Sequence, residues 1–264
     1  MIRITYVTIT FNAAKVLQRT LDSVLQQDYP NIVHLIIDGA STDDTLRLVD
    51  DYIARSNASE NGHRIQVTSE PDKGIYDAMN KGLRSLDGDY VCFLNAGDFL
   101  PSPDTVSKIA QQVENVQCSM FNVQYPAVLY GNTDIVDGEG RFLHHRRLSP
   151  PENLTWKSFK QGMLVCHQAF YARTDFAIAT PYDMQYRYSA DVDWCIRVMK
   201  AAEKENVPLL NLKMVVANYT EEGQTTLHHR ESLCERYKVM EHHYGRIQTC
   251  LLHVWFVIRA LLKH

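Results

Sequence analysis

The chain has 264 residues, of which 45% are apolar and 22% are charged, and its formal net charge is −4. This length and composition are typical of a globular protein with one large α/β domain or two small ones. Because there is no basic excess to neutralise a phosphate backbone, the chain is not expected to bind nucleic acid.

The N-terminal sequence and the cysteines both favour a cytoplasmic protein. The first residues alternate apolar side chains with Thr and Arg, as in a strand, and no signal-peptide cleavage site follows. None of the six cysteines forms a C-x-x-C pair. We therefore expect buried, reduced thiols rather than disulfides.

The first hundred residues alternate strand and helix patterns. We expect strands at Ile2–Thr10, Ile32–Ile37, Ile65–Ser69 and Tyr90–Leu94. The intervening helices are expected to begin after Asn12, after a capping box of Ser41 and Asp44, and near Tyr76. This alternation predicts a mainly parallel sheet, in which ligands bind beyond the carboxyl ends of the strands.

The pattern is less regular after Pro103. Short strands are expected at Val128–Gly131, Asp134–Val136 and Arg141–His145, and helices at Ser189–Lys200, Arg230–Tyr244 and Ile247–Leu262. Because no linker or internal repeat divides the chain, we expect one continuous domain followed by C-terminal helices.

Polar residues gather at the carboxyl ends of the predicted strands. Asp38 and Ser41 follow the second strand, where a carboxylate suits a ribose hydroxyl but also suits a helix cap. Lys73 and the glycine after it begin a helix that can hold a diphosphate, or they form a charged turn. Asn95 to Asp98 follow the fourth strand, where an acid can bind a divalent cation or belong to an ordinary turn.

Four motifs in this order resemble the inverting glycosyltransferases of family 2, and most of all the bacterial enzymes that assemble capsular polysaccharide or exopolysaccharide. They are VTITFN, LIIDGASTDDT, SEPDKGIYDAMNKG and GDYVCFLNAGD. The resemblance resumes at YGNTD, CHQ and SADVDW. Because the four motifs follow successive predicted strands, they are far more specific together than any one is alone.

The resemblance implies an α/β GT-A fold, with a mainly parallel central sheet flanked by helices. It implies transfer of a sugar from a nucleoside-diphosphate donor, such as a UDP-sugar, to a hydroxyl of a glycan or polyprenyl-linked acceptor. Mg²⁺ or Mn²⁺ would be the cofactor. Residues 1–100 are then the donor half of the domain, residues 101–225 the acceptor and catalytic half, and residues 226–264 a helical appendage.

The resemblance also assigns roles to individual acids. By position, Asp38 resembles the nucleoside-binding acid, Asp98 the metal-binding acid and Asp191 the general base, with Asp193 as the second choice for the base. The residues expected around the donor are Thr10, Asn12, Asp38, Ser41, Asp72, Lys73, Gly74, Asn80, Asn95, Ala96 and Gly97. A base is needed because the attacking acceptor hydroxyl must lose its proton.

Two departures from the family pattern leave other functions open. One acid rather than two stands at Asp38, and Asn95 and Gly97 occupy places where metal motifs often have acids. A non-catalytic carbohydrate-binding protein on a degenerate transferase fold is therefore one alternative. A sugar nucleotidyltransferase is another, although the Gly-rich loop of such enzymes is missing after the first predicted strand.

The sequence does not decide whether the last predicted helix binds a membrane or packs on protein. Its apolar residues fill one broad face, while Arg246, Arg259 and Lys263 gather on the other side. The segment is too short to cross a bilayer, but it suits a helix lying on the inner face of the cytoplasmic membrane. Packing on its own domain or on a second subunit explains the pattern equally well.

Overall fold

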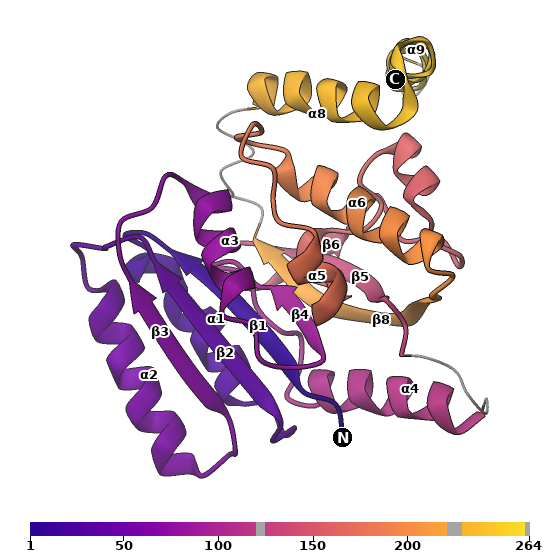
Figure 1. Cartoon of the computed structure of the whole chain (residues 1–264). Helices are drawn as coiled ribbons and strands as arrows, with labels where there is room; N and C mark the ends of the chain where they lie inside the picture. The colour runs from indigo at the N-terminus through magenta and orange to yellow at the C-terminus, as the bar shows by residue number, and fades with distance from the viewer. Residues whose placement is uncertain (120–124, 221–228, 262–264) are drawn as a thin grey trace.

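The computed structural model describes residues 1–119, 125–220 and 229–261 (Figure 1). Its sheet has eight strands in the order β3-β2-β1-β4-β7-β5-β6, and β8 also pairs with β5. The strands are β1 (Ile4–Thr10), β2 (Ile32–Asp38), β3 (Arg64–Ser69), β4 (Tyr90–Phe93), β5 (Val128–Val136), β6 (Phe142–His145), β7 (Phe170–Arg173) and β8 (Leu209–Thr220). The helices are α1 (Ala14–Leu25), α2 (Thr45–Ser59), α3 (Ile75–Arg84), α4 (Thr105–Ser119), α5 (Thr174–Ala179), α6 (Ala190–Lys204), α8 (His229–Tyr244) and α9 (Arg246–Leu261), with the short 3-10 helices η1 (Trp156–Gln161) and η2 (His167–Ala169).

The first four strands form the parallel half of the sheet, as predicted. β1 pairs in parallel with β2 and β4, and β2 pairs in parallel with β3. β7 runs antiparallel to both β4 and β5, so β5 and its parallel neighbour β8 point in the same direction as β1. The carboxyl ends of all these parallel strands therefore meet at one edge of the sheet, away from the chain's N-terminus in Figure 1.

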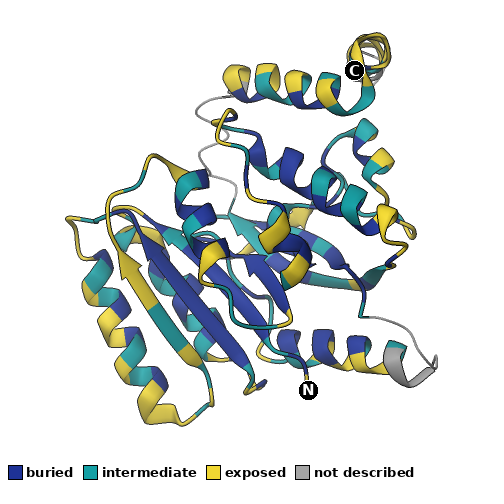
Figure 2. Ribbon diagram, in the orientation of Figure 1, coloured by how far each residue is buried: buried dark blue, intermediate teal, exposed yellow. Residues whose placement is uncertain are grey.

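Helices cover both faces of the parallel half. Ile36 packs with α1 and α2, whereas its neighbour Ile37 faces α3, because successive side chains of a strand point to opposite faces. α3 approaches β1 so closely that a Cβ atom on Gly82 would stand 2.7 Å from Val7 Cγ1. β1 and β2 are buried, whereas β3 is a more exposed edge strand (Figure 2).

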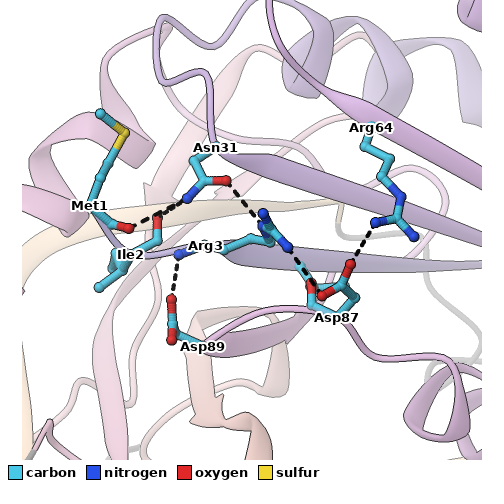
Figure 3. Close-up of polar contacts among 8 residues, drawn as sticks. Met1, Ile2, Arg3, Asn31, Arg64, Asp87 and Asp89 are labelled. Atoms are coloured by element: carbon cyan, nitrogen blue, oxygen red, sulfur yellow. Dashed lines mark hydrogen bonds and ion pairs between the residues drawn. The ribbon is translucent and has the colours of Figure 1, made fainter.

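A polar network links the amino ends of the strands (Figure 3). The Arg3 guanidinium donates to Asn31 Oδ1 at 3.1 Å and to Asp87 Oδ1 at 3.1 Å. Arg64 donates to the other oxygen of Asp87 at 2.6 Å, and the Arg3 N–H donates to Asp89 at 2.7 Å. Partly exposed ion pairs of this kind add little stability each. Their effect is to connect β1, β3 and the turn before β4 at the edge opposite to the carboxyl ends.

The expected capping box of Ser41 and Asp44 is wrong, and Asn12 does not cap the helix that follows it. α1 has no side-chain cap, and Asn12 Oδ1 instead accepts from the backbone N–H of Thr42 at 2.9 Å. α2 likewise has no side-chain cap, because the Ser41 hydroxyl turns back to the Asp38 carboxylate. Both polar side chains connect loops at the carboxyl edge of the sheet instead of capping the N-terminus of a helix.

The rest of the chain follows the predictions unevenly. The strands expected at Val128–Gly131 and Asp134–Val136 are one strand, β5. α4, α5, β7 and β8 have no counterpart among the predicted elements, whereas α6, α8 and α9 are confirmed with ends shifted by a few residues. The described cysteines are unpaired, as expected, but those of α8 and α9 are exposed rather than buried.

α8 and α9 lie together at one end of the molecule, next to α6 (Figure 1). α9 contacts α8 and η1 and leaves a stripe of apolar side chains exposed. The stripe consists of Ile247, Leu251, Val254, Trp255 and Ile258. No helix in the described ranges is long and apolar enough to cross a membrane.

Candidate active site

Asp38 forms an anionic cluster at the ends of β1, β2 and β3. Its buried carboxylate accepts hydrogen bonds from the hydroxyls of Thr10 at 2.9 Å and Ser69 at 2.7 Å. It also accepts from both the backbone N–H and the hydroxyl of Ser41. Burial alone raises the pKa of a carboxyl, but these hydrogen bonds outweigh it and hold the pKa of Asp38 below its ordinary value. The carboxylate therefore orders the loops that follow β1 and β2.

The loop between β3 and α3 lies against this cluster. A Cβ atom on Gly39 would stand 2.5 Å from Asp72 Oδ2, so the missing side chain lets Asp72 approach. Asp72 Oδ1 accepts from the N–H of Gly74 at 2.8 Å, and Gly74 has a φ of +119°, a conformation that favours glycine. Lys73 is exposed between them. The structure thus brings Asp72, Lys73 and Gly74 next to the loop that Asp38 orders.

The contacts of Asn80 account for its buried position in α3 without a ligand. Its side chain is buried in α3, donates to the carbonyl of Tyr182 at 3.0 Å and accepts from the Tyr182 N–H at 2.8 Å. Both ends of the amide therefore hold the segment that leads into α6. We treat Asn80 as a structural link and leave it out of the proposed donor site.

Asp98 is the buried acid after β4. Its side chain is 5% exposed and accepts from Gln168 Nε2 at 2.7 Å and from the Thr220 N–H at 3.2 Å. Burial raises the pKa of Asp98 to about 6, although both hydrogen bonds act to lower it. A buried carboxyl of this kind is stabilised in its ionised form by a nearby cation.

The residues between Asn95 and Asp98 form a tight turn. The Gly97 N–H donates to Thr20 Oγ1 at 2.9 Å, and the Gly97 carbonyl accepts from Thr220 Oγ1 at 2.8 Å. Ala96 lies between Asn95 and Gly97 in this turn. Gly97 has a φ of +100°, so a side chain at this position is strained. The glycine that weakens the metal motif in the sequence is thus explained by the turn.

The oxygen donors of this turn fit a hard divalent cation. Asn95 Oδ1 is buried and makes no hydrogen bond within the described part of the chain. Asp98 belongs to the same turn, because its N–H donates to the Asn95 carbonyl at 3.0 Å. No group of three His, Cys, Asp or Glu side chains is placed to hold a metal among the described residues. Mg²⁺ commonly uses one or two protein oxygens and completes its shell with water and phosphate, which suits this pair.

Asp191 lies in the first turn of α6, where two side chains fix its carboxylate. The Tyr76 hydroxyl donates to Oδ1 at 3.1 Å, and His167 Nδ1 lies 3.3 Å from Oδ2. Burial acts to raise the pKa of Asp191, but His167, the charge of Arg236 and the Tyr76 hydrogen bond together hold it below its ordinary value. Asp191 is therefore ionised at neutral pH, as a general base must be.

Asp193 makes different contacts, although it lies only two residues away. Its side chain is 3% exposed, and its carboxylate accepts from Arg197 Nε at 2.6 Å and lies 2.8 Å from His243 Nε2. These partners come from α6 itself and from α8. Asp193 therefore acts as an internal link between the two helices, which favours Asp191 over Asp193 as the base.

His167 connects Asp191 to the loop after β4. Its Nε2 lies 2.9 Å from Asn95 Nδ2, and its Nδ1 faces Asp191. Because an amide nitrogen only donates, Nε2 accepts and Nδ1 carries the proton that faces the carboxylate. A continuous hydrogen-bonded chain thus joins Asp191 to the turn that contains Asp98.

A cavity of about 290 Å³ lies between β5, β6 and β8. It is lined by Asn132, Thr133, Asp134, His145, Arg146, Leu148, Ser149 and Val215. Thr133 hydrogen-bonds the thiol of Cys166, the residue before His167. The cavity contains neither Asp38 nor Asp98, so it is separate from the loops at the ends of β1 to β4.

Four residues of the site are missing from the predicted set. Tyr76 and His167 hold Asp191, and Gln168 holds Asp98. The ring of Phe11, which is 65% exposed, lies 3.3 Å from the Cβ position of Gly39. Tyr76 and the pair His167-Gln168 lie inside motifs that carry the family resemblance, so these motifs could have identified them as site residues. Phe11 likewise lies inside VTITFN, another of these motifs.

Comparison with known sequences gives close relatives. A model of the family described as Glycosyl transferase family 2 matches residues 5–177. The chain is 34% identical over 217 residues to a Mycobacterium tuberculosis protein named PGL/p-HBAD biosynthesis glycosyltransferase, which covers 81% of this chain and 75% of the relative. It is 32% identical over 203 residues to an uncharacterized glycosyltransferase of the same species, over 76% of this chain and 70% of the relative.

Solved structures share the fold. The chain matches S. aureus TarS 1-349 in complex with UDP-GlcNAc with a TM-score of 0.67 and 17% identity, over 90% of this chain and 64% of that one. It matches the mannosyltransferase PcManGT from Pyrobaculum calidifontis, in complex with GDP-Man and Mn²⁺, with a TM-score of 0.60 and 16% identity, over 96% of this chain and 68% of that one. The chain spans 38% of the longer TarS chain. The chain has the GT-A fold and belongs to the family 2 glycosyltransferases.

Proposed function

We propose that the protein is an inverting glycosyltransferase that uses a nucleoside-diphosphate sugar and takes Asp191 as its general base. The observation that supports this best is the Asp191 carboxylate itself. It is ionised, held between Tyr76 and His167, and connected through Asn95 to the turn that bears Asp98. This arrangement gives a base on one side of a site whose other side suits a diphosphate.

The donor site that we propose follows the carboxyl ends of β1 to β4. Asp38 orders its loops, Asp72 to Gly74 border it, and Phe11 offers an exposed aromatic face for a base. Relatives of known structure bind UDP-GlcNAc and GDP-Man, and a UDP-sugar is our choice for this chain. Asp98 and Asn95 Oδ1 would hold Mg²⁺ or Mn²⁺, which stabilises negative charge on a leaving diphosphate.

In the proposed reaction, the acceptor hydroxyl attacks the anomeric carbon of the donor sugar. Its proton passes to the Asp191 carboxylate as the new C–O bond forms. The bond between the anomeric carbon and the phosphate oxygen breaks, and the nucleoside diphosphate leaves with the electron pair. Attack from the side opposite to the leaving group inverts the configuration of the sugar. His167 and Tyr76 keep the base oriented throughout.

The acceptor side that we propose is the cavity between β5, β6 and β8. It lies next to the residue before His167 and is lined by hydroxyl, amide and charged side chains, which suit sugar hydroxyls. A glycan or a polyprenyl-linked sugar of cell-surface polysaccharide synthesis is the acceptor class that we propose. Residues 101–225 are then the acceptor half of the domain, and residues 1–100 the donor half.

The exposed stripe of α9 supports peripheral attachment to the inner face of the cytoplasmic membrane. Ile247 is 81% exposed and Leu251 66% exposed, and Arg246 begins the same helix. The Arg259 side chain and Lys263, which belong to the predicted basic face, lie outside the described part of the chain. A helix with an apolar stripe and basic ends binds at the headgroup level of anionic membranes, where a polyprenyl-linked acceptor is found.

A panel of UDP-, GDP- and dTDP-sugars tests this proposal. Wild-type protein is incubated with each donor and a membrane-lipid extract as acceptor, and nucleoside diphosphate release is measured with Mg²⁺ or Mn²⁺. We expect release with one nucleotide class, and loss of that release in Asp191→Asn. If calorimetry detects no binding of any donor, the protein is a non-catalytic member of the fold. Release of pyrophosphate from a nucleoside triphosphate and a sugar phosphate would show a nucleotidyltransferase instead.

A further inference from the structure

α8 holds the residues that lead into α6. The Glu235 carboxylate accepts from three consecutive backbone N–H groups: Arg187 at 2.9 Å, Tyr188 at 2.6 Å and Ser189 at 3.1 Å. Ser189 precedes the first helical residue of α6, and Arg187 and Tyr188 come before it, so the carboxylate lies at the N-terminal end of the helix, where the helix dipole favours a negative charge. Glu235 therefore caps α6 from a helix that begins about forty residues later in the chain.

The start of α6 has no cap of its own. Ser189 stands at the position before the first helical residue but makes no side-chain capping bond. Its hydroxyl instead donates to the backbone carbonyl of Ser232 on α8 at 3.2 Å. Both the backbone and the side chain of this residue are thus fixed by α8 rather than by α6.

Asp191 lies two residues beyond Ser189, so the contacts of α8 act directly on its position. The adjacent residue of α8, Arg236, helps to lower the pKa of Asp191, and its Nε is buried without a hydrogen-bond partner in the described residues. The charge of Glu235 contributes to the raised pKa of Tyr76, after burial and Asp191 itself. Two neighbouring charges of α8 therefore act electrostatically on Asp191 and on its hydrogen-bond partner Tyr76.

A second contact holds α8 to α6 farther along. His243, near the end of α8, lies 2.8 Å from Asp193, and both side chains are 3% exposed. His243 also faces Lys200 Nζ at 3.0 Å. α8 is thus attached through Glu235 to the residues just before α6 and through His243 to the first turn of α6, which leaves little freedom for α6 to move alone.

We infer that Glu235 is a positioning residue for glycosyl transfer: by capping α6 it fixes the first turn of that helix, and with it the Asp191 carboxylate. This inference rests on the proposed role of Asp191 as the base. α8 is then a part of the catalytic unit, although the family resemblance implies that residues 226–264 are an appendage. A carboxylate displaced by about 1 Å from its working position is expected to lose up to about 10²-fold in rate.

The test uses the full chain with Glu235→Gln and Glu235→Ala, and Glu231→Gln as the matched control. Glu231 is an exposed acid one turn earlier on α8. Glutamine keeps only one acceptor oxygen for three N–H groups, so we expect kcat to fall about 10-fold in Glu235→Gln and further in Glu235→Ala. The donor KM is expected to change less than about 3-fold, because Glu235 bonds the residues before α6 and none of the residues of the proposed donor site. Hydrogen exchange of residues 187–193 should become faster in both variants and stay unchanged in the control.

A double variant separates positioning from a general loss of stability. If Glu235 acts through Asp191, adding Glu235→Gln to Asp191→Asn lowers the residual rate no further, because the effects of residues that act as a unit are not additive. Wild-type kcat in Glu235→Ala, together with an inactive Asp191→Asn, would overturn the inference and leave the proposed function intact. A loss of rate that multiplies with that of Asp191→Asn would also overturn it. An active Asp191→Asn would instead overturn the proposed function.

Discussion

His167 Nδ1 lies 3.3 Å from Asp191 Oδ2. The contact fixes one oxygen of Asp191, while Tyr76 fixes the other. We expect His167→Ala to lower kcat by about 10- to 100-fold with little change in donor KM, because it removes orientation of the base rather than donor contacts. His167→Asn, which keeps a donor near the position of Nδ1, should recover part of the loss. Steady-state kinetics on the three proteins measure this, and wild-type kcat in His167→Ala would contradict it.

Asp98 provides the test of the metal. Asp98→Ala should abolish the response of turnover to Mg²⁺ or Mn²⁺ and weaken donor binding by about 10-fold or more, since the diphosphate loses its cation. Asp104→Ala removes a half-exposed acid six residues later and should change neither property. A metal titration of turnover measures the metal response, and calorimetry measures donor binding. Wild-type activity that survives exhaustive EDTA treatment would exclude a metal-dependent mechanism.

Asp38 should contribute to stability in a way that depends on pH. Four donors face its buried carboxylate, so Asp38→Asn leaves donors unpaired and should lower the free energy of unfolding at pH 7 by about 1–3 kcal/mol. The pKa of Asp38 is lowered in the folded state. Its stabilising effect is therefore complete above the unfolded pKa of about 3.9 and is lost as the pH falls through the folded pKa.

Urea unfolding of wild type and Asp38→Asn between pH 3 and pH 7 measures this effect. The difference between the two proteins should be constant above about pH 5 and shrink toward pH 3. Asp44→Asn, at an exposed acid six residues away, is the control and should follow wild type at each pH. A difference that does not change over this range would show that Asp38 contributes through shape alone.

The parallel half of the fold was predictable from the sequence because its signals are local. β1 to β4 are short apolar or β-branched runs bounded by polar turns, and the polar residues that follow them lie at one edge for topological reasons. β8 shows the opposite case, since its twelve residues are mostly half-buried and follow no alternation. Its place beside β5 is decided by long-range pairing, which no window of sequence contains.

The candidate site could be predicted only at positions where the residue type usually has one role. Asp38, Asp98 and Asp191 stand out as acids at strand or helix ends, and the structure puts each in a buried polar setting. Asn80 and Gly82 are both poor helix formers inside α3. Asn80 binds the backbone of Tyr182, and Gly82 permits close packing on β1, so tertiary contacts account for both residues.

The apolar stripe of α9 provides a test of membrane attachment. Full-length protein should float with vesicles that contain anionic phosphatidylglycerol, and the variant with Leu251→Ser and Trp255→Ser should remain soluble. Both residues are exposed, so the fold is expected to be retained. Ile178→Ser, at an exposed apolar residue of α5, is the matched control and should float like wild type. If no form floats at low salt and light scattering shows a dimer that the double variant lacks, α9 is a subunit interface.

Asp191→Asn, compared with Asp193→Asn, tests the account most directly. The measurement is single-turnover transfer together with donor affinity and the thermal midpoint of each protein. We expect Asp191→Asn to lose about 10²- to 10⁴-fold in rate, with donor affinity and thermal midpoint close to wild type, because only the base is removed. Asp193→Asn should instead lower the thermal midpoint, because it breaks the buried link to Arg197 and His243, and keep most of its rate while folded. An Asp191→Asn protein that transfers sugar at the wild-type rate, or an Asp193→Asn protein that is folded but inactive, would contradict the assignment of Asp191 as the base.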